Sequence, residues 1–181
     1  NPTNGLTDNE TDYARSSRIG SMGGGSVLPT LNITNFGFSV PIDAVILGYQ
    51  IDVRLRKWSS AGNSSPTLES VGIIADGAVR AASGSTIISS TTFITQTFGG
   101  ETSLPYALTA DSANSSAFGV SMRLRSANTG TTVYGIDVAW AKITIYYAQP
   151  SAGYQIVSQT RMAGAGSNVT GKSGDNNTAW S

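Results

Sequence analysis

The sequence contains neither cysteine nor histidine. Their absence excludes thiol nucleophiles, imidazole bases, disulfide bonds and the side chains that most often bind transition metals. An enzyme built on this chain would depend on carboxylates, hydroxyls and a few basic groups. The chemistry on offer is therefore narrow, and we expect no enzyme, no metal and no cofactor.

Charged residues are also scarce, at 12% of 181 residues, and eleven acidic residues balance eleven basic ones. Because the chain has no net charge to attract nucleic acid or an anionic surface, we expect no nucleic-acid partner. No apolar run approaches the ~20 residues of a membrane-spanning helix, so we expect no membrane insertion. The chain is instead rich in 25 serines, 20 threonines and 21 glycines. This composition favours an extracellular, cell-surface or virion-surface location.

Two-residue alternation is the strongest pattern in the chain. Apolar residues take every second position in residues 47–57 and 118–125, and polar residues stand between them. This pattern predicts long strands with one solvated face. A third run, residues 134–147, changes phase near Ala141 and Lys142, which predicts a bulge or a bend. Weaker strands are expected at residues 30–40, 68–75, 86–97 and 154–160.

These elements predict an all-β fold. About seven or eight mostly antiparallel strands, each solvated on one side, favour a two-sheet β-sandwich that is jelly-roll-like and carries a C-terminal extension. The only helical candidate is a short turn at residues 109–116. We expect a sandwich in residues 1–147, a linker or strand in 148–160 and an extension in 161–181.

Several segments share a strand pattern. Residues 37–48 read Gly-Phe-Ser-Val-Pro-Ile-Asp-Ala-Val-Ile-Leu-Gly, residues 116–120 read Ser-Ala-Phe-Gly-Val, and residues 143–147 read Ile-Thr-Ile-Tyr-Tyr. Together they resemble a repeat-type β-sandwich domain of phage structural and bacterial surface proteins. Asp43 stands where that family often has glycine, which aspartate tolerates at modest cost in the left-handed region. The resemblance implies a structural role.

The same family carries a Trp-x-Asn-Pro-x-Asn element, and this chain divides that element between its two ends. The sequence begins Asn-Pro-Thr-Asn and ends Trp-Ser, so that tail followed by head restores the element. A Tyr-Ala pair and a lead-in strand, which accompany the element in the family, also have counterparts here. The predicted junction residues are Asn1, Pro2, Asn4, Tyr13, Asn168, Val169 and Trp180.

This division predicts that residues 161–181 complete the next copy of the domain. The copies are either tandem repeats in one polypeptide or subunits that exchange a strand. Repetition of such a heterologous contact produces a filament. The alternative is a coincidental match, with Trp180 in a tail.

Two sets of acidic residues are candidate chemical sites. Asp52 and Asp137 lie on strands and could form a glycosidase pair, but their alternation positions predict a solvated face. Asp8, Glu10 and Asp12 have the spacing of oxygen ligands for Ca²⁺, but a solvated acidic turn is favoured.

The aromatic and basic residues raise the possibility of glycan partners. Trp58, at a strand end, could stack on a sugar, whereas Tyr49 and Trp140 are predicted to lie in the core. Four outward arginines could pair with carboxylates or bind an anionic glycan, and a plain solvated face is favoured. These arginines are Arg54, Arg56, Arg123 and Arg125. Possible glycosylation sites, each in an Asn-x-Ser/Thr sequence, are Asn9, Asn32, Asn63, Asn114, Asn168 and Asn176.

The sequence therefore predicts a structural protein. The leading hypothesis is a subunit or repeat of a head-to-tail extracellular filament, surface fibre or virion appendage, whose main partner is itself. The alternatives are a carbohydrate- or receptor-binding β-sandwich module and a capsid decoration protein.

Overall fold

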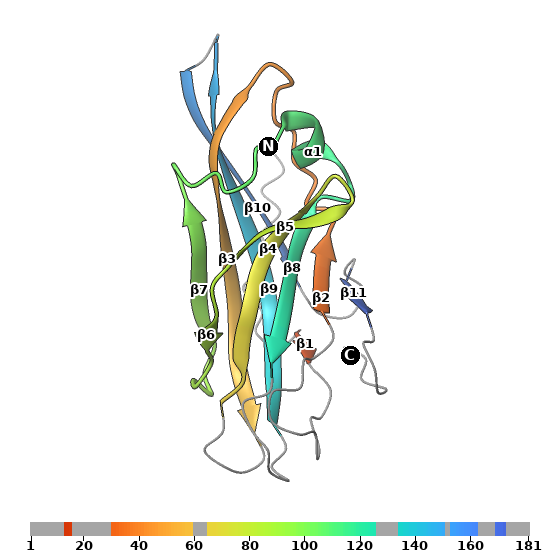
Figure 1. The fold of residues 1–181 in the computed structure, drawn as a ribbon, viewed down its shortest axis with the longest axis vertical. Coiled ribbons are helices and arrows are strands. Elements are labelled where there is room, and N and C mark those ends of the chain that lie inside the picture. Colours follow the sequence, from red (N-terminus) through yellow and green to blue (C-terminus); the bar gives the residue numbers. More distant parts are fainter. Residues whose placement is uncertain are drawn as a thin grey trace.

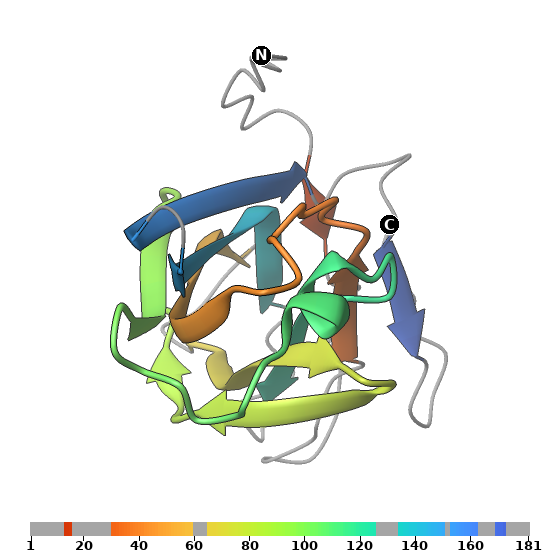
Figure 2. The ribbon, with the colours of Figure 1, turned by 90° about the horizontal axis from the view of Figure 1, so that it is seen from above.

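The computed structural model describes residues 13–15, 30–59, 65–125, 134–150, 153–162 and 169–172. Two antiparallel sheets pack face to face, and their strands run along the long axis of the molecule (Figure 1). Seen from one end, β10 and the β4–β5 hairpin lie on opposite sides of the molecule (Figure 2). The predicted all-β, two-sheet sandwich is confirmed. None of the described residues forms a helix that is long and apolar enough to cross a membrane.

The first sheet, sheet A, is built around the long strand β9. Its five strands are β1 (Ala14–Arg15), β3 (Val45–Ser59), β7 (Ile94–Gly100), β9 (Tyr134–Gln149) and β10 (Gly153–Met162). One edge of β9 pairs with β3 along almost its whole length. The other edge is shared, because β1 pairs with Asp137 and Val138 while β10 pairs with residues 140–149.

The second sheet, sheet B, has six strands in the order β11-β2-β8-β4-β5, and β6 also pairs with β4. Their bounds are β2 (Thr30–Thr34), β4 (Thr67–Ala75), β5 (Ala78–Ser83), β6 (Thr86–Ile87), β8 (Gly119–Arg125) and β11 (Val169–Lys172). The core between the sheets is formed by the apolar positions of the alternating runs. Fully buried examples are Leu31, Ile33, Leu55, Leu68, Ile73, Phe118, Met122 and Ile136.

The predicted change of phase in β9 is confirmed. Val138 lies opposite Leu55, but Trp140 lies opposite Arg54, so Ala139 is an extra residue that forms a bulge. After the bulge, Trp140 lies on the same outer face as Arg54. Trp140 is therefore half-buried on the outer face of sheet A, and its predicted place in the core is wrong.

A second irregularity, in β3, corrects another expectation. Ile46 pairs with Tyr147 and Gly48 with Tyr146, which leaves Leu47 without a partner position. Leu47 was expected to face inward, but it is 38% exposed because of this bulge. Tyr49, two residues later, is back in phase and buried, as predicted.

Two further regions of the chain differ from the sequence expectation. The β4–β5 hairpin was not anticipated; it turns at Asp76 and Gly77, which both adopt positive φ angles of 51° and 73°. Residues 86–97 were expected to form one strand but form β6 and the start of β7. Between them Ile88 enters the core, and a turn at Ser90 and Thr92 changes the chain direction.

The expected helical turn is confirmed as α1 (Ala110–Asn114). The Thr109 side chain caps its start by accepting a hydrogen bond of 3.2 Å from the Ser112 backbone N–H. At its other end, the Asn114 side chain accepts from the Val40 backbone N–H at 2.7 Å and donates to the Val40 carbonyl at 2.8 Å. This pair of bonds fixes the chain just before β3.

The described part of residues 148–160 belongs to sheet A, as the end of β9 and most of β10. β10 pairs with β9 in continuous register. β10 extends to Met162, so its last two residues fall within the expected C-terminal extension, 161–181. Arg161 donates from Nε to the Asn35 carbonyl at 2.6 Å, which ties β10 to the loop that follows β2.

A glycine in β8 is required by its distance from β2. A Cβ at Gly119 would lie 2.0 Å from the Ile33 carbonyl oxygen, whereas a Cβ at Gly100 would meet no atom within 4 Å. We predict that Gly119→Ala lowers the free energy of unfolding by about 1–3 kcal/mol, because two backbones must separate. Gly100→Ala, the matched control, should stay within about 0.5 kcal/mol. Urea unfolding measures both, and equal stability of the two variants would contradict the close approach.

Candidate functional site

The structure bears on only part of the predicted junction. Tyr13 and Val169 are described; Asn1, Pro2, Asn4, Asn168 and Trp180 lie outside the described residues. The Ca²⁺ candidates Asp8, Glu10 and Asp12 and the sequons at Asn9, Asn63 and Asn176 also lie outside them. Among the described residues, no cluster of three or more acidic side chains is arranged to hold a metal ion.

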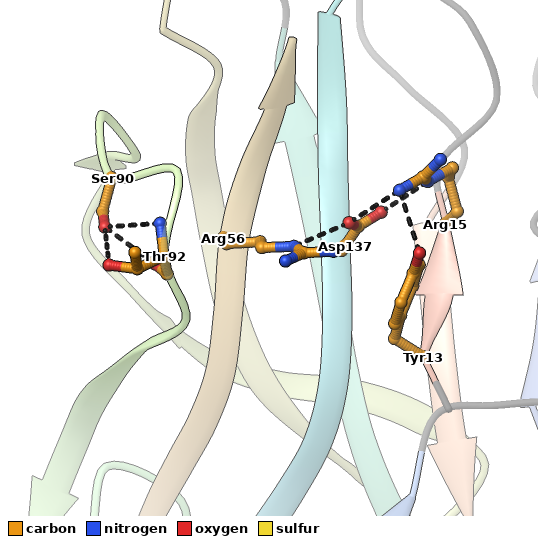
Figure 3. Close-up of polar contacts among 6 residues, drawn as sticks. All are labelled: Tyr13, Arg15, Arg56, Ser90, Thr92 and Asp137. Carbon is orange, nitrogen blue, oxygen red and sulfur yellow. Dashed lines mark hydrogen bonds and ion pairs between the residues drawn. The ribbon is translucent and has the colours of Figure 1, made fainter. Parts of the chain in front are cut away.

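A buried carboxylate lies on the outer face of sheet A, where β1 joins β9. Asp137 is 0% exposed and binds two guanidinium groups (Figure 3). Arg15 of β1 donates to it twice, from Nε at 2.8 Å and from a terminal nitrogen at 3.0 Å, and Arg56 of β3 donates from Nε at 2.9 Å. The bond to Asp137 is also the main cause that raises the pKa of Arg15 above its ordinary value. Three strands are thus joined through one side chain.

Aromatic rings enclose this ion-pair cluster. The Arg15 guanidinium lies 5.0 Å from the Trp58 ring centre and 5.2 Å from that of Tyr13. The Arg56 guanidinium lies 5.2 Å from the Tyr13 ring centre and 4.4 Å from that of Phe93. Cations over aromatic faces are stabilised by the ring quadrupole, most strongly where water is excluded. We call Tyr13, Arg15, Arg56, Trp58, Phe93 and Asp137 the Asp137 cluster.

The turn before β7 positions Phe93 in this cluster. The Ser90 hydroxyl donates to the Thr92 carbonyl at 2.7 Å and accepts from the Thr92 backbone N–H at 3.2 Å (Figure 3). The Ser90 carbonyl in turn accepts a bond of 2.7 Å from the Lys57 backbone N–H. These bonds hold the turn against β3, so that Phe93 follows it directly onto the outer face.

A second carboxylate, Asp52, lies further along the same face and is 4% exposed. Lys142 contacts it at 2.8 Å, Thr97 donates at 2.7 Å and the Gln50 amide donates at 3.0 Å. Burial alone would raise the pKa of Asp52, but the bonds from Lys142, Thr97 and Gln50 together outweigh it and lower that pKa. The prediction that Asp52 and Asp137 face solvent is wrong, since neighbouring side chains cover both.

The two carboxylates do not have the geometry of a glycosidase pair. Asp52 lies opposite Lys142 and Asp137 lies opposite Arg56. They are therefore separated by four residues along the strands, or about 13 Å. A catalytic pair needs ~5–10 Å and one acid with a raised pKa, whereas each carboxylate here binds a cation. Both residues act chemically as structural ion-pair centres.

The four candidate arginines do not form one surface. Arg54 and Arg56 lie on sheet A, where Arg56 binds Asp137 and Arg54 approaches the Thr95 hydroxyl at 3.5 Å. Arg123 and Arg125 lie on sheet B, and both contact Glu69 of β4, Arg123 at 2.8 Å. Pairing with carboxylates, one of the options from the sequence, therefore accounts for Arg56, Arg123 and Arg125.

Two sequons, at Asn32 and Asn114, lie among the described residues. Asn32 lies in β2 between β11 and β8, and its side-chain oxygen is buried. Asn114 uses its amide nitrogen and oxygen to bind the Val40 backbone, so its amide nitrogen is already hydrogen-bonded in the folded chain.

The tail contributes a strand to sheet B. Val169–Lys172 pairs antiparallel with β2, with Val169 opposite Ile33 and Thr170 opposite Asn32. The structure contains one chain, and this pairing is within that chain. Pairing with a neighbouring copy, which the sequence predicts, stays a prediction. Sequence reasoning found the strand through its resemblance to a lead-in strand, but it missed β1 and the Asp137 cluster.

Comparison with protein-family models, with curated proteins and with solved structures found no match to this chain.

The Asp137 cluster generates a stability prediction. Asp137→Asn should lower the free energy of unfolding by about 2–3 kcal/mol, because Arg15 and Arg56 lose a common anion that is fully buried. Glu69→Gln is the matched control. It also removes a carboxylate from two arginines, but that carboxylate's side chain is 25% exposed and not fully buried, so the change should cost less, about 1 kcal/mol. Urea unfolding followed by tryptophan fluorescence measures the free energy of unfolding of both variants. An Asp137→Asn variant as stable as the wild type would show that the cluster contributes no stability.

Asp52 generates a pH prediction. Its pKa is lower in the folded chain than its ordinary value of 3.8, so its contribution to stability is complete above that value. That contribution is lost as the pH falls through the folded pKa. Thr97→Val removes one hydrogen bond to the carboxylate and should move the acid limb of the stability curve to higher pH. Thermal unfolding between neutral and acid pH measures this shift, and superimposed curves would rule out the role of Thr97.

Proposed function

We propose that this chain is a structural subunit or repeat of an extracellular filament, surface fibre or virion appendage, assembled head to tail through its C-terminal segment. The observation that carries the proposal is the position of β11. This four-residue strand comes from the end of the chain and lies at the edge of sheet B, against β2.

The edge that β11 covers belongs to β2, a strand whose apolar side chains form part of the core. Leu31 and Ile33 of β2 are 0% exposed, and β2 pairs on its other side with β8. Without β11, the outer backbone groups of β2 would have no strand partner among the described residues. An uncovered edge of this kind attracts another strand. A C-terminal segment is therefore a natural partner for it.

A neighbouring copy supplies the same partner. Its residues 169–172 present an identical backbone and the same register to β2, so exchange between copies loses no contact at this edge. The choice between the two arrangements then depends on concentration. Exchange in one direction uses different surfaces on the two copies. It does not close on itself, and it extends as a filament.

The glycan-binding alternative receives less support. One face of the Trp58 ring, its proposed stacking surface, is covered by the Arg15 guanidinium at 5.0 Å. A sugar would have to displace an arginine that is bonded to Asp137. The outer face of sheet A is thereby better suited to holding β1 in place than to binding a glycan.

Substitutions in β11 test the proposal. Proline has no backbone N–H and is poorly accommodated in a paired strand, so Thr170→Pro should abolish the filaments seen by electron microscopy. Thr170→Val, which keeps the N–H and a β-branched side chain, should leave filaments intact.

Deletion of residues 169–181 gives an independent check and spares Arg161 and Met162 of β10. Filaments that persist in both the deletion and the Thr170→Pro variant would contradict the proposal. A wild-type chain that stays monomeric at every concentration would contradict it equally.

A further inference from the structure

The longest edge strand among the described residues is β10, and its backbone has a strand partner on one side only. It has ten residues, compared with seven in β7 and six in β5. Within the described part of the chain, it pairs with β9 and with no other strand. Natural edge strands are usually protected by lysine, proline, a bulge or shortness. β10 contains neither lysine nor proline, and its register with β9 is unbroken.

Exposed apolar side chains accompany this open edge. Tyr154 and Ile156 of β10 are 44% and 56% exposed. Tyr154 lies opposite Ala148 of β9, which in turn lies opposite Val45 of β3, and Val45 is 61% exposed. The outer face of sheet A therefore changes from the polar surroundings of Asp52 to an apolar patch of Val45, Tyr154 and Ile156 at the β10 side. Exposed apolar groups beside an open edge mark an interaction surface.

We propose that β10 pairs antiparallel with β10 of a second copy, around a two-fold axis at Val157, so that the two A sheets become one continuous sheet. This interface is separate from the β11 edge and does not depend on the proposed filament. It is isologous, since both copies use the same surface.

The sequence of β10 is self-complementary in this register. Ile156 of each copy lies opposite Ser158 of the other, and the two Ile156 side chains are diagonal neighbours on the outer face, within the reach of cross-strand contacts. The two Val157 residues lie directly opposite each other on the core side. The single charged residue, Arg161, lies opposite Gly153 of the other copy, so like charges do not meet. No other charge on β10 opposes self-pairing.

The open edge also favours a second copy over a peptide of different charge. β10 offers a ladder of backbone groups and uncharged side chains, with its one guanidinium bonded to the Asn35 carbonyl of its own chain. A second β10 strand, whose one charged side chain is bonded to its own chain, fits the edge and its apolar patch.

Sedimentation equilibrium of the full-length chain tests the proposal, with Thr170→Pro as the background so that exchange of β11 does not contribute. A reversible monomer–dimer equilibrium is expected. Ile156→Lys places a charge at the centre of the interface and should raise the dimer dissociation constant at least ~10-fold. Ile156 is exposed in the single chain. The variant should therefore have the same melting temperature as the monomeric Thr170→Pro chain.

Ile87→Lys is the control. Ile87 is 67% exposed on β6 of sheet B, and the same change there should leave the dissociation constant unaltered. A Thr170→Pro chain that is monomeric throughout the micromolar range would overturn the proposal. A dimer that Ile156→Lys leaves intact, or that Ile87→Lys weakens equally, would assign the contact to another surface and overturn it as well. Loss of filaments alone would not overturn the β10 proposal, because filaments depend on β11.

Discussion

Unpaired backbone groups at the edges of the two sheets are the constraint on which the rest of this structure depends. A sandwich of two open sheets has four edges, and each N–H and C=O there needs a partner or water. In sheet A, β1 and β10 in succession cover one edge of β9, and β10 becomes the new edge strand. Sheet B resolves one edge by pairing β2 with β11, a strand from the end of the chain. Segments distant in sequence thus complete the sandwich.

The Asp137 cluster explains how a strand of two residues can hold such an edge. β1 makes little backbone ladder by itself, but Arg15 binds a buried carboxylate on β9, and that carboxylate also binds Arg56 on β3. Aromatic rings contact both guanidinium groups and add cation–π attraction to the ion pairs. Side-chain electrostatics replace backbone pairing at this edge. At the β11 edge the chain relies on the backbone ladder, which any copy can provide.

Alternation in the sequence predicted β3, β8 and β9 and the change of phase near the bulge at Ala139, because the side-chain period of a strand is a local property. It did not predict β5, whose short hairpin depends on the Asp76–Gly77 turn. Alternation also placed Asp137 correctly on the outer face but could not show that it is buried. Its cover comes from Arg15 and from aromatic residues elsewhere in the chain, which periodicity does not reveal. For the same reason, a strand pattern at residues 169–172 does not specify which copy of β2 it pairs with.

The most direct test of the account uses this register and the absence of cysteine from the chain. Thr170 lies opposite Asn32, so a chain carrying Asn32→Cys and Thr170→Cys can form a disulfide wherever β11 meets β2. Oxidation under assembly conditions, followed by a non-reducing denaturing gel, separates the two arrangements. Exchange between copies predicts a ladder of covalent multimers that collapses on reduction. A single band of internally bridged monomer under those conditions would show that each chain keeps its own last strand, and it would contradict head-to-tail assembly.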